Sequence, residues 1–317
     1  MDHTVIAALP TSIRPLVETQ LPGWLQVRWF SGKDEALAAG PGAEIGWFDL
    51  WEKQDMAAAV INASSMQWLN SMITGMDGLP LQTLRQRQVR VTNGAGINAI
   101  TIAEYVLMGM LTIAKGYRDV VRAQERHEWP SDAPGKRELC GSKALLLGYG
   151  AIGKRVEARL QAFQVEVTVV RRTPDAGVLA LGPDQWRARL GDFDWVILAV
   201  PATPETERML GAAEFSAMKP SAVVVNVARG SVIDQDALVR ALRDQRIAAA
   251  FLDVTEPEPL PPAHPLWSLD NAHITMHLSG RSQTRMFERA AERFLENLRR
   301  YRAGDPLLHQ VDLALGY

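Results

Sequence analysis

The chain has 317 residues, of which 47% are hydrophobic and 22% charged, and its formal net charge is −2. This length allows two domains that each bury an apolar core, and the composition is that of an ordinary globular protein. The near-neutral charge argues against a partner such as nucleic acid or an anionic membrane surface. The longest apolar runs are strand-sized, well short of the roughly 20 residues that cross a bilayer.

The single cysteine, Cys140, cannot form an internal disulfide. The N-terminal residues lack the succession of basic, apolar and small residues that is typical of a signal peptide. We therefore expect a cytoplasmic protein. The histidines and Cys140 are scattered without the spacing of metal ligands, so no metal site is predicted.

The N-terminal third alternates short apolar segments with helix-like or Gly- and Pro-bearing pieces. The expected strands are Val5–Leu9, Leu25–Phe30, Ile45–Phe48, Trp68–Ile73 and Val89–Thr92. This alternation indicates a small α/β layer structure with a mostly parallel sheet. The next segment, Asn98–His127, has no proline and carries apolar residues at helical spacing, so one long helix is expected there.

A second and stronger β/α alternation follows a loop at Trp129–Gly141. Its expected strands are Ala144–Leu147, Val165–Val170, Trp195–Val200, Ala222–Val227, Ala249–Val254 and Ile274–Met276, with helices at Ile152–Phe163 and Asp236–Asp244. Nearly continuous apolar strands separated by helices indicate a parallel sheet covered on both faces. The last expected element is an amphipathic helix, Gln283–Arg302, which could pack back onto the first domain.

The segment LLLGYGAIGKRV places three glycines in GxGxxG spacing, directly after an apolar strand and at the start of a helix. In a dinucleotide-binding fold the first glycine permits the tight turn, the second lets a pyrophosphate approach the backbone, and the third lets the helix pack against the strand. The N–H groups and the dipole at the helix start favour phosphate. The predicted cofactor contacts are Gly148, Tyr149, Gly150, Ala151, Ile152 and Gly153.

An acidic residue that binds the ribose hydroxyls is expected about 20 residues beyond these glycines, at the end of the second strand. In VEVTVVRRTP this position holds Arg171 and Arg172, followed by Thr173. A carboxylate would repel the 2′-phosphate of NADP, whereas guanidinium groups form forked, charge-assisted bonds to phosphate. NADP is therefore predicted to be preferred to NAD. The alternative is that both arginines only solvate a strand end, and Asp175 lies close by.

Three later segments place polar residues just beyond predicted strands, at the edge where open α/β sheets bind ligands. They are NVARGSVID, LDVTEPEPLP and HITMHLSG. Together they offer an arginine, two glutamates and two histidines, a set suited to carbonyl reduction. Spacing alone does not choose between Glu256 and Glu258, whereas His273 lies at the start of its expected strand and His277 beyond the end.

With GYGAIG, VPATPET, NVARGSVID, DVTEPEPLP and ITMHLSG in this order, the chain resembles the D-isomer-specific 2-hydroxyacid dehydrogenase family, and more narrowly its glyoxylate/hydroxypyruvate reductase branch. The resemblance implies a catalytic triad of Arg229, Glu258 and His277. Arg229 would hold the carboxylate of a 2-keto acid and polarise its carbonyl group. His277 would donate a proton, and Glu258 would favour its charged form. Met276 departs from the family, which usually has proline there, so the constraint on the histidine backbone is in doubt.

The resemblance also assigns contacts outside the triad. In SMITGMDGL, the backbone of Thr74, Gly75 and Met76 would bind the substrate carboxylate, with a plain turn as the alternative. Further cofactor contacts fall on Pro201, Thr206, Val227 and Asp253, of which Asp253 would meet the nicotinamide carboxamide. Trp47 could line the substrate pocket or belong to the core.

The expected fold is α/β, with two doubly wound Rossmann/flavodoxin-like domains, parallel sheets and an interdomain cleft. Residues 97–280 would bind NAD(P), and residues 1–96 with 281–317 would bind the substrate. The expected function is NADPH-dependent reduction of a small 2-keto acid, of the glyoxylate or hydroxypyruvate type, to the R-2-hydroxy acid. The resemblance implies a homodimer. The alternatives are an NAD-linked dehydrogenase for another acid, such as 3-phosphoglycerate, and a non-catalytic, dinucleotide-sensing corepressor.

Overall fold

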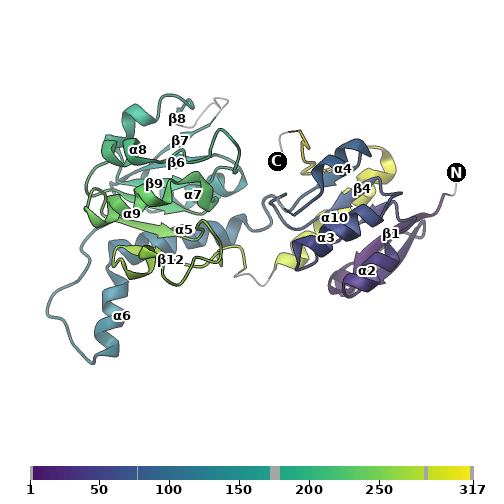
Figure 1. Ribbon diagram of the computed structural model, residues 1–317, viewed down its shortest axis with the longest axis horizontal. Coiled ribbons are helices and arrows are strands. Elements are labelled where there is room, and N and C mark those ends of the chain that lie inside the picture. Colours follow the sequence, from purple (N-terminus) through teal and green to yellow (C-terminus); the bar gives the residue numbers. More distant parts are fainter. Residues whose placement is uncertain (1–2, 77, 172–178, 282–284, 315–317) are drawn as a thin grey trace. The chain divides into compact units, whose positions relative to one another are not determined.

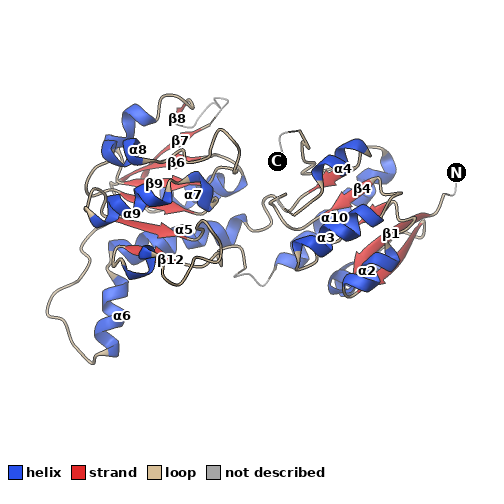
Figure 2. Cartoon of the chain, viewed as in Figure 1, coloured by secondary structure: helices blue, strands red, loops and turns tan. Residues whose placement is uncertain are grey.

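The structure is a computed structural model that describes residues 3–76, 78–171, 179–281 and 285–314. The chain divides into two compact units, one of Met1–Ile97 with Gln283–Tyr317 and one of Asn98–Ser282. Both contain a parallel sheet flanked by helices, drawn as red arrows and blue coils in Figure 2. The expected α/β class with two parallel sheets is therefore confirmed.

The first unit is built on a five-stranded sheet of order β2-β1-β3-β4-β5, the flavodoxin-like order. Its strands are β1 (Val5–Pro10), β2 (Leu25–Phe30), β3 (Ile45–Gly46), β4 (Trp68–Asn70) and β5 (Arg90–Thr92). Its helices are α1 (Arg14–Val17), α2 (Lys33–Ala39), α3 (Lys53–Asn62), α4 (Leu81–Gln86) and α10 (Met286–Ala303), with short 3-10 helices at Thr11–Ile13 and Glu18–Gln20. β3 and β4 end earlier than their apolar runs, so Phe48 and Ile73 lie in the loops that follow.

Helix α10 returns to the first unit from the C-terminal end of the sequence, as the amphipathic pattern suggests. Phe294 on this helix stacks on Trp68 at a ring distance of 5.4 Å and lies 5.3 Å from the ring of Trp47. All three side chains are fully buried. Trp47 is therefore a core residue.

The second unit is built on a seven-stranded sheet of order β12-β11-β10-β9-β6-β7-β8, the Rossmann order, which reverses between β6 and β9. Its strands are β6 (Lys143–Leu147), β7 (Glu166–Val170), β8 (Ala180–Leu181), β9 (Trp195–Leu198), β10 (Val223–Asn226), β11 (Ala249–Leu252) and β12 (Ala272–Ile274). Its helices are α5 (Ala99–Ala114), α6 (Tyr117–Glu125), α7 (Ala151–Ala162), α8 (Ala212–Ala217) and α9 (Gln235–Arg243), with 3-10 helices at Arg187–Asp192, Gly230–Val232 and Pro265–Ser268.

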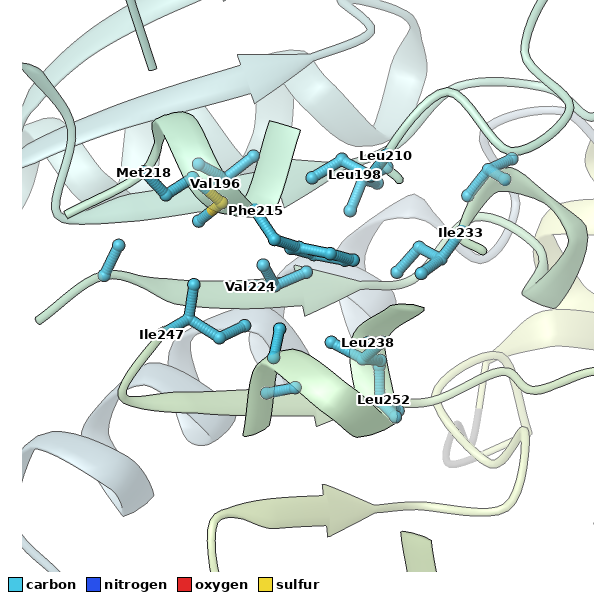
Figure 3. Close-up of a cluster of buried hydrophobic side chains, with 14 of the residues drawn as sticks. Val196, Leu198, Leu210, Phe215, Met218, Val224, Ile233, Leu238, Ile247 and Leu252 are labelled. Carbon is cyan, nitrogen blue, oxygen red and sulfur yellow. The ribbon is translucent and has the colours of Figure 1, made fainter. Parts of the chain in front are cut away.

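The continuous apolar strands of this sheet are buried on both faces. Successive residues of β6 alternate, since Leu145 and Leu147 belong to one core cluster and Leu146 to another. The first cluster packs under α8 and α9, which contribute Phe215 and Leu238 (Figure 3). The second packs under α5 and α7. This explains why the strands could be recognised as uninterrupted apolar runs.

The expectation of one long helix over Asn98–His127 was wrong. Helices α5 and α6 are separate and bent by 67°. Between them Gly116 has a φ of +59°, and a Cβ atom there would lie 2.8 Å from the backbone nitrogen of Gly135. A side chain is therefore excluded where the later loop crosses, and glycine supplies the turn.

Among the described residues, no single helix is long and apolar enough to cross a membrane. The bent pair of α5 and α6, taken together, meets that requirement by length and composition alone.

Candidate active site

One row of paired residues crosses the seven-stranded sheet at its carboxyl edge. In the parallel register its members are Val170, Leu147, Leu198, Asn226, Leu252 and Ile274, taken from β7, β6, β9, β10, β11 and β12. The glycine loop, the arginine motif, the glutamate motif and the histidine motif each follow a member of this row. The register therefore brings motifs that are far apart in the sequence to one edge of the second unit.

The glycine loop joins β6 to α7 where the strand order reverses. Gly148 has a φ of +100°, and a Cβ atom there would lie 2.5 Å from the carbonyl oxygen of Ala199. A Cβ atom on Gly153 would lie 2.3 Å from the carbonyl oxygen of Gly148. A Cβ atom on Gly150, by contrast, would have no described atom within 4 Å apart from those of its neighbours along the chain. The first and third glycines are thus required by the chain's own packing, while the second faces open space that suits a pyrophosphate.

The other predicted cofactor residues lie along the same edge. The hydroxyl group of Thr206 accepts a hydrogen bond from the Thr203 N–H (2.8 Å) and donates one to the Pro201 carbonyl oxygen (2.7 Å), which shapes the loop after β9. Val227 is buried directly after β10. Arg171 is partly buried directly after β7.

Two predicted cofactor contacts, Arg172 and Thr173, lie outside the described residues, as does Asp175.

His277 and Glu258 are hydrogen-bonded, with 2.6 Å between His277 Nδ1 and Glu258 Oε2. Burial is the largest influence on the pKa of Glu258 and raises it, but the contact with His277, the Thr255 N–H and the charge of Arg229 together hold the pKa below its usual value. Glu258 is therefore an ionised acceptor at neutral pH. With Nδ1 engaged in this way, Nε2 is the nitrogen that can exchange a proton with a substrate.

The arginine and glutamate motifs lie directly against each other. A Cβ atom on Gly230 would lie 2.1 Å from the carbonyl carbon of Thr255, so only glycine allows this approach. Arg229, the preceding residue, donates from Nη1 to the Ala228 carbonyl oxygen at 2.8 Å. The structure thus brings Arg229, Glu258 and His277 of the predicted triad to one place.

Asp253 holds the turn that carries His277. Its buried carboxylate accepts hydrogen bonds from the Thr275 hydroxyl (2.7 Å), the Leu278 N–H (3.0 Å) and both the N–H and the hydroxyl group of Ser279. Its carbonyl oxygen accepts the His277 N–H at 2.5 Å. Asp253 is therefore a positioning residue for the histidine. The predicted contact with the nicotinamide stays a prediction.

The backbone of the histidine turn is left-handed. Met276 has a φ of 51° and His277 a φ of 57°. This conformation costs a non-glycine residue roughly 1–2 kcal/mol. Proline, with φ near −65°, could not adopt the backbone of Met276. The backbone at His277 is therefore constrained without a proline at position 276, because the hydrogen bonds to Asp253 hold the turn.

Gln235, the first residue of α9, was missed from the sequence. Its side-chain amide donates to the Glu256 carbonyl oxygen (2.6 Å) and accepts the Glu256 N–H (3.0 Å). This pair of bonds fixes the backbone two residues before Glu258. A polar residue at a helix start is too common to signal such a role, so no sequence pattern could have identified it.

The alternatives within these motifs are separated by contacts. Glu256 and Glu258 are both exposed, but Glu258 bonds to His277, whereas no such bond involves the side chain of Glu256 among the described residues. His273 lies in the middle of β12, and its pKa is lowered to about 4 by burial and by the charges of Arg118 and Arg122, against a smaller opposing effect of Asp119. His273 is therefore neutral at physiological pH and unsuited to donate a proton there.

In the first unit, the predicted carboxylate loop follows β4. Asp49 accepts hydrogen bonds from the Ser71 hydroxyl (2.6 Å) and the Met72 N–H (2.7 Å), which fixes the start of this loop. The Asn93 side chain donates to the Thr74 carbonyl oxygen at 3.1 Å. Among the described residues, no acceptor bonds to the N–H of Thr74 or Gly75. The Met76 side chain is buried in the core, and the binding of a carboxylate by the amides of this loop stays a prediction.

The lowered pKa of His273 predicts a pH-dependent loss of stability. The unfolded chain binds a proton at this residue near the usual pKa of 6.5 and the folded chain only near 4, so the free energy of unfolding falls as the pH falls through that window. We expect His273→Gln to reduce this fall, measured by thermal unfolding at several pH values between these limits. Equal pH dependence in the two proteins would contradict the assignment.

Comparison with known proteins places these features in a family. Residues 107–279 match the family described as "D-isomer specific 2-hydroxyacid dehydrogenase, NAD binding domain". The glyoxylate reductase/hydroxypyruvate reductase of Homo sapiens is 30% identical over 262 residues, which cover 79% of this chain and 78% of that protein. The D-3-phosphoglycerate dehydrogenase of Archaeoglobus fulgidus is 31% identical over 230 residues, which cover 70% of this chain but only 43% of that protein.

Solved structures agree with the sequence relatives. A D-isomer specific 2-hydroxyacid dehydrogenase family protein from Aeromonas salmonicida has a TM-score of 0.87 and 28% identity, covering 98% of this chain and 99% of that one. The D-isomer specific 2-hydroxyacid dehydrogenase of Xanthobacter autotrophicus Py2, in complex with NADPH and MES, has a TM-score of 0.82 and 27% identity, covering 99% and 100%. The chain therefore belongs to the D-isomer specific 2-hydroxyacid dehydrogenase family and is an NAD(P)-dependent oxidoreductase.

Proposed function

We propose that this enzyme uses NADPH to reduce a small 2-keto acid of the glyoxylate or hydroxypyruvate type to the R-2-hydroxy acid. The observation that carries the proposal is the bond between His277 and Glu258, beside Arg229. A proton donor held by a carboxylate, next to a fixed cation, is the set that reduction of a keto acid requires. The relatives that are named glyoxylate reductases support this substrate type.

Each member of the triad has one role in this proposal. Arg229 binds the substrate carboxylate and polarises the carbonyl oxygen with its forked donors. When bound, the nicotinamide supplies the hydride to the carbonyl carbon. His277 gives the proton from Nε2 to the developing alkoxide, and Glu258 stabilises the imidazolium and orients its ring. In the first unit, the N–H groups of Thr74, Gly75 and Met76 add donors for the substrate carboxylate.

The preference for NADPH rests on the positive side chains at the end of β7. Arg171 is the described member of that group, and Arg172 and Thr173 complete it in the proposal. A guanidinium group at this position attracts the 2′-phosphate that distinguishes NADPH from NADH. The relative from Xanthobacter autotrophicus that was solved with NADPH supports the same assignment.

The alternative substrate is a different acid used with NAD, such as 3-phosphoglycerate. The 31% identity to a D-3-phosphoglycerate dehydrogenase favours this candidate. A panel of glyoxylate, hydroxypyruvate, phenylpyruvate and phosphohydroxypyruvate, each with NADPH and NADH, separates the two. Highest kcat/KM for phosphohydroxypyruvate with NADH would overturn the proposed function. Tight cofactor binding without turnover of any acid would favour the dinucleotide-sensing alternative.

We also propose that the second unit forms the homodimer interface. A surface cavity of about 370 Å³ lies between α5, α6 and β12. Exposed apolar side chains surround it, and they are Met108, Tyr117 and Trp267. Figure 1 shows α6 and the loop after it extending away from the sheet of their own unit. A second copy of the same surface would cover these side chains.

Loss of the proton donor should reduce turnover without weakening cofactor binding. His277→Asn should lower kcat by roughly 10²- to 10⁴-fold, the usual contribution of a general acid, with an unchanged Kd for NADPH. Glu258→Gln should lower kcat less, because it keeps a partner for the ring but removes the charge that favours the imidazolium. Glu256→Gln is the matched control, and a loss of kcat as large as that of Glu258→Gln would contradict the assignment of Glu258.

Removal of the guanidinium group after β7 should weaken NADPH selectively. Arg171→Ala should raise the KM for NADPH and leave the KM for NADH nearly unchanged, because only NADPH carries the 2′-phosphate. Initial rates with a single keto acid and both cofactors measure this difference. Equal changes in the two KM values would defeat the assignment.

The dimer is tested by mass in solution. We expect size-exclusion chromatography with light scattering to give twice the chain mass of 35.0 kDa. Met108→Glu combined with Tyr117→Glu should give the monomer, since both carboxylates would be buried in the interface. Ile61→Glu, on the first unit, is the control. A wild-type protein of monomer mass would contradict the proposal.

A further inference from the structure

Tyr149, the second residue of the glycine loop, has a fixed side chain. Its hydroxyl group donates a hydrogen bond to Glu157, which is buried and lies further along α7. The tyrosine ring is therefore held against the N-terminal half of this helix. Nothing in the GxGxxG pattern requires a tyrosine at this position, so its anchoring calls for a separate explanation.

Two cations from different elements gather at this ring. Lys154 Nζ, in the first part of α7, lies 5.8 Å from the ring centroid. Arg171 Cζ, directly after β7, lies 5.6 Å from the same centroid. An aromatic ring attracts cations to its face and so holds both long side chains near one place. The described residues give Lys154 no ion-pair partner.

The position of these charges matches one part of the cofactor. Lys154 is the fourth residue of α7, whose first turn follows Gly150, and Arg171 directly follows β7, so both elements that a dinucleotide-binding fold uses for the adenosine end contribute a charge near Tyr149. Because both cations lie near the same ring, an anion bound beside that ring would be attracted by both. A 2′-phosphate on the adenosine ribose would be such an anion, and it forms charge-assisted bonds to both kinds of side chain.

We propose that Lys154 is a second specificity-determining cation for the 2′-phosphate of NADPH. Tyr149, anchored by Glu157, is the positioning residue that holds Lys154 and Arg171 in place for it. The inference rests on the proposed preference for NADPH and adds residues that the motif at the end of β7 does not include. Holding both cations in advance reduces the ordering cost of binding.

Binding of two nucleotides without the nicotinamide tests the role of Lys154 directly. 2′,5′-ADP carries the 2′-phosphate and 5′-AMP lacks it, so calorimetry with both isolates its contribution. Lys154→Ala should weaken 2′,5′-ADP about fivefold, the effect of one partly exposed ion pair, and leave 5′-AMP unchanged. Arg155→Ala, which removes the same charge from the next residue of the helix, should change neither affinity.

The anchor is tested by a pair of variants at Glu157. Glu157→Ala removes the acceptor for the Tyr149 hydroxyl group, so it should reduce the preference for 2′,5′-ADP over 5′-AMP. Glu157→Gln keeps an acceptor and should restore the preference. A purely structural role would lower the thermal unfolding temperature without changing the ratio of the two affinities, and that result would overturn the role of the anchor.

The outcomes separate this inference from the function on which it rests. If the wild-type enzyme uses NADPH and NADH equally and binds both nucleotides alike, the proposed cofactor preference fails, and the inference with it. If the wild-type enzyme prefers NADPH but Lys154→Ala and Arg155→Ala bind 2′,5′-ADP equally well, only the inference is overturned.

Discussion

The close approach of three loops at the carboxyl edge of the seven-stranded sheet is the constraint on which the candidate site depends. Gly230 lets the arginine loop touch the backbone at Thr255. The buried carboxylate of Asp253, directly after β11, accepts hydrogen bonds from Thr275, Leu278 and Ser279 and so fixes the turn after β12. With both in place, His277 Nδ1 and Glu258 Oε2 lie 2.6 Å apart. The proposed catalytic chemistry thus depends on packing and hydrogen bonds that take no part in the reaction.

The order of the strands separates the proposed cofactor-binding residues from the proposed catalytic residues along that edge. The reversal between β6 and β9 places the glycine loop near the middle of the sheet, with β7 on one side and β10, β11 and β12 on the other. Arg171, directly after β7, lies on the side proposed to bind the adenosine end of a dinucleotide, while the three loops on the other side hold the proposed proton donor, His277. One long cofactor lying across the edge can therefore reach both groups.

The strands could be predicted well and some of their connections could not. A strand buried on both faces is a continuous apolar run, so β6, β7, β9, β10 and β11 were each expected near their observed bounds. β8 has only two residues and carries no such run. The break between α5 and α6 depends on the contact of Gly116 with Gly135, which are distant in the sequence, so helical periodicity missed it.

The sequence by itself determined the kinds of chemistry present, because the glycine spacing, the arginines after β7 and the polar motifs beyond the strands are local patterns. Spacing did not separate Glu256 from Glu258, although the family resemblance favoured Glu258, and no pattern revealed the contacts of Gln235, Lys154 or Glu157. Tertiary structure decided these, because each depends on hydrogen bonds or ring contacts between elements. Such contacts form only when the sheet register brings those elements together, and no local pattern records them.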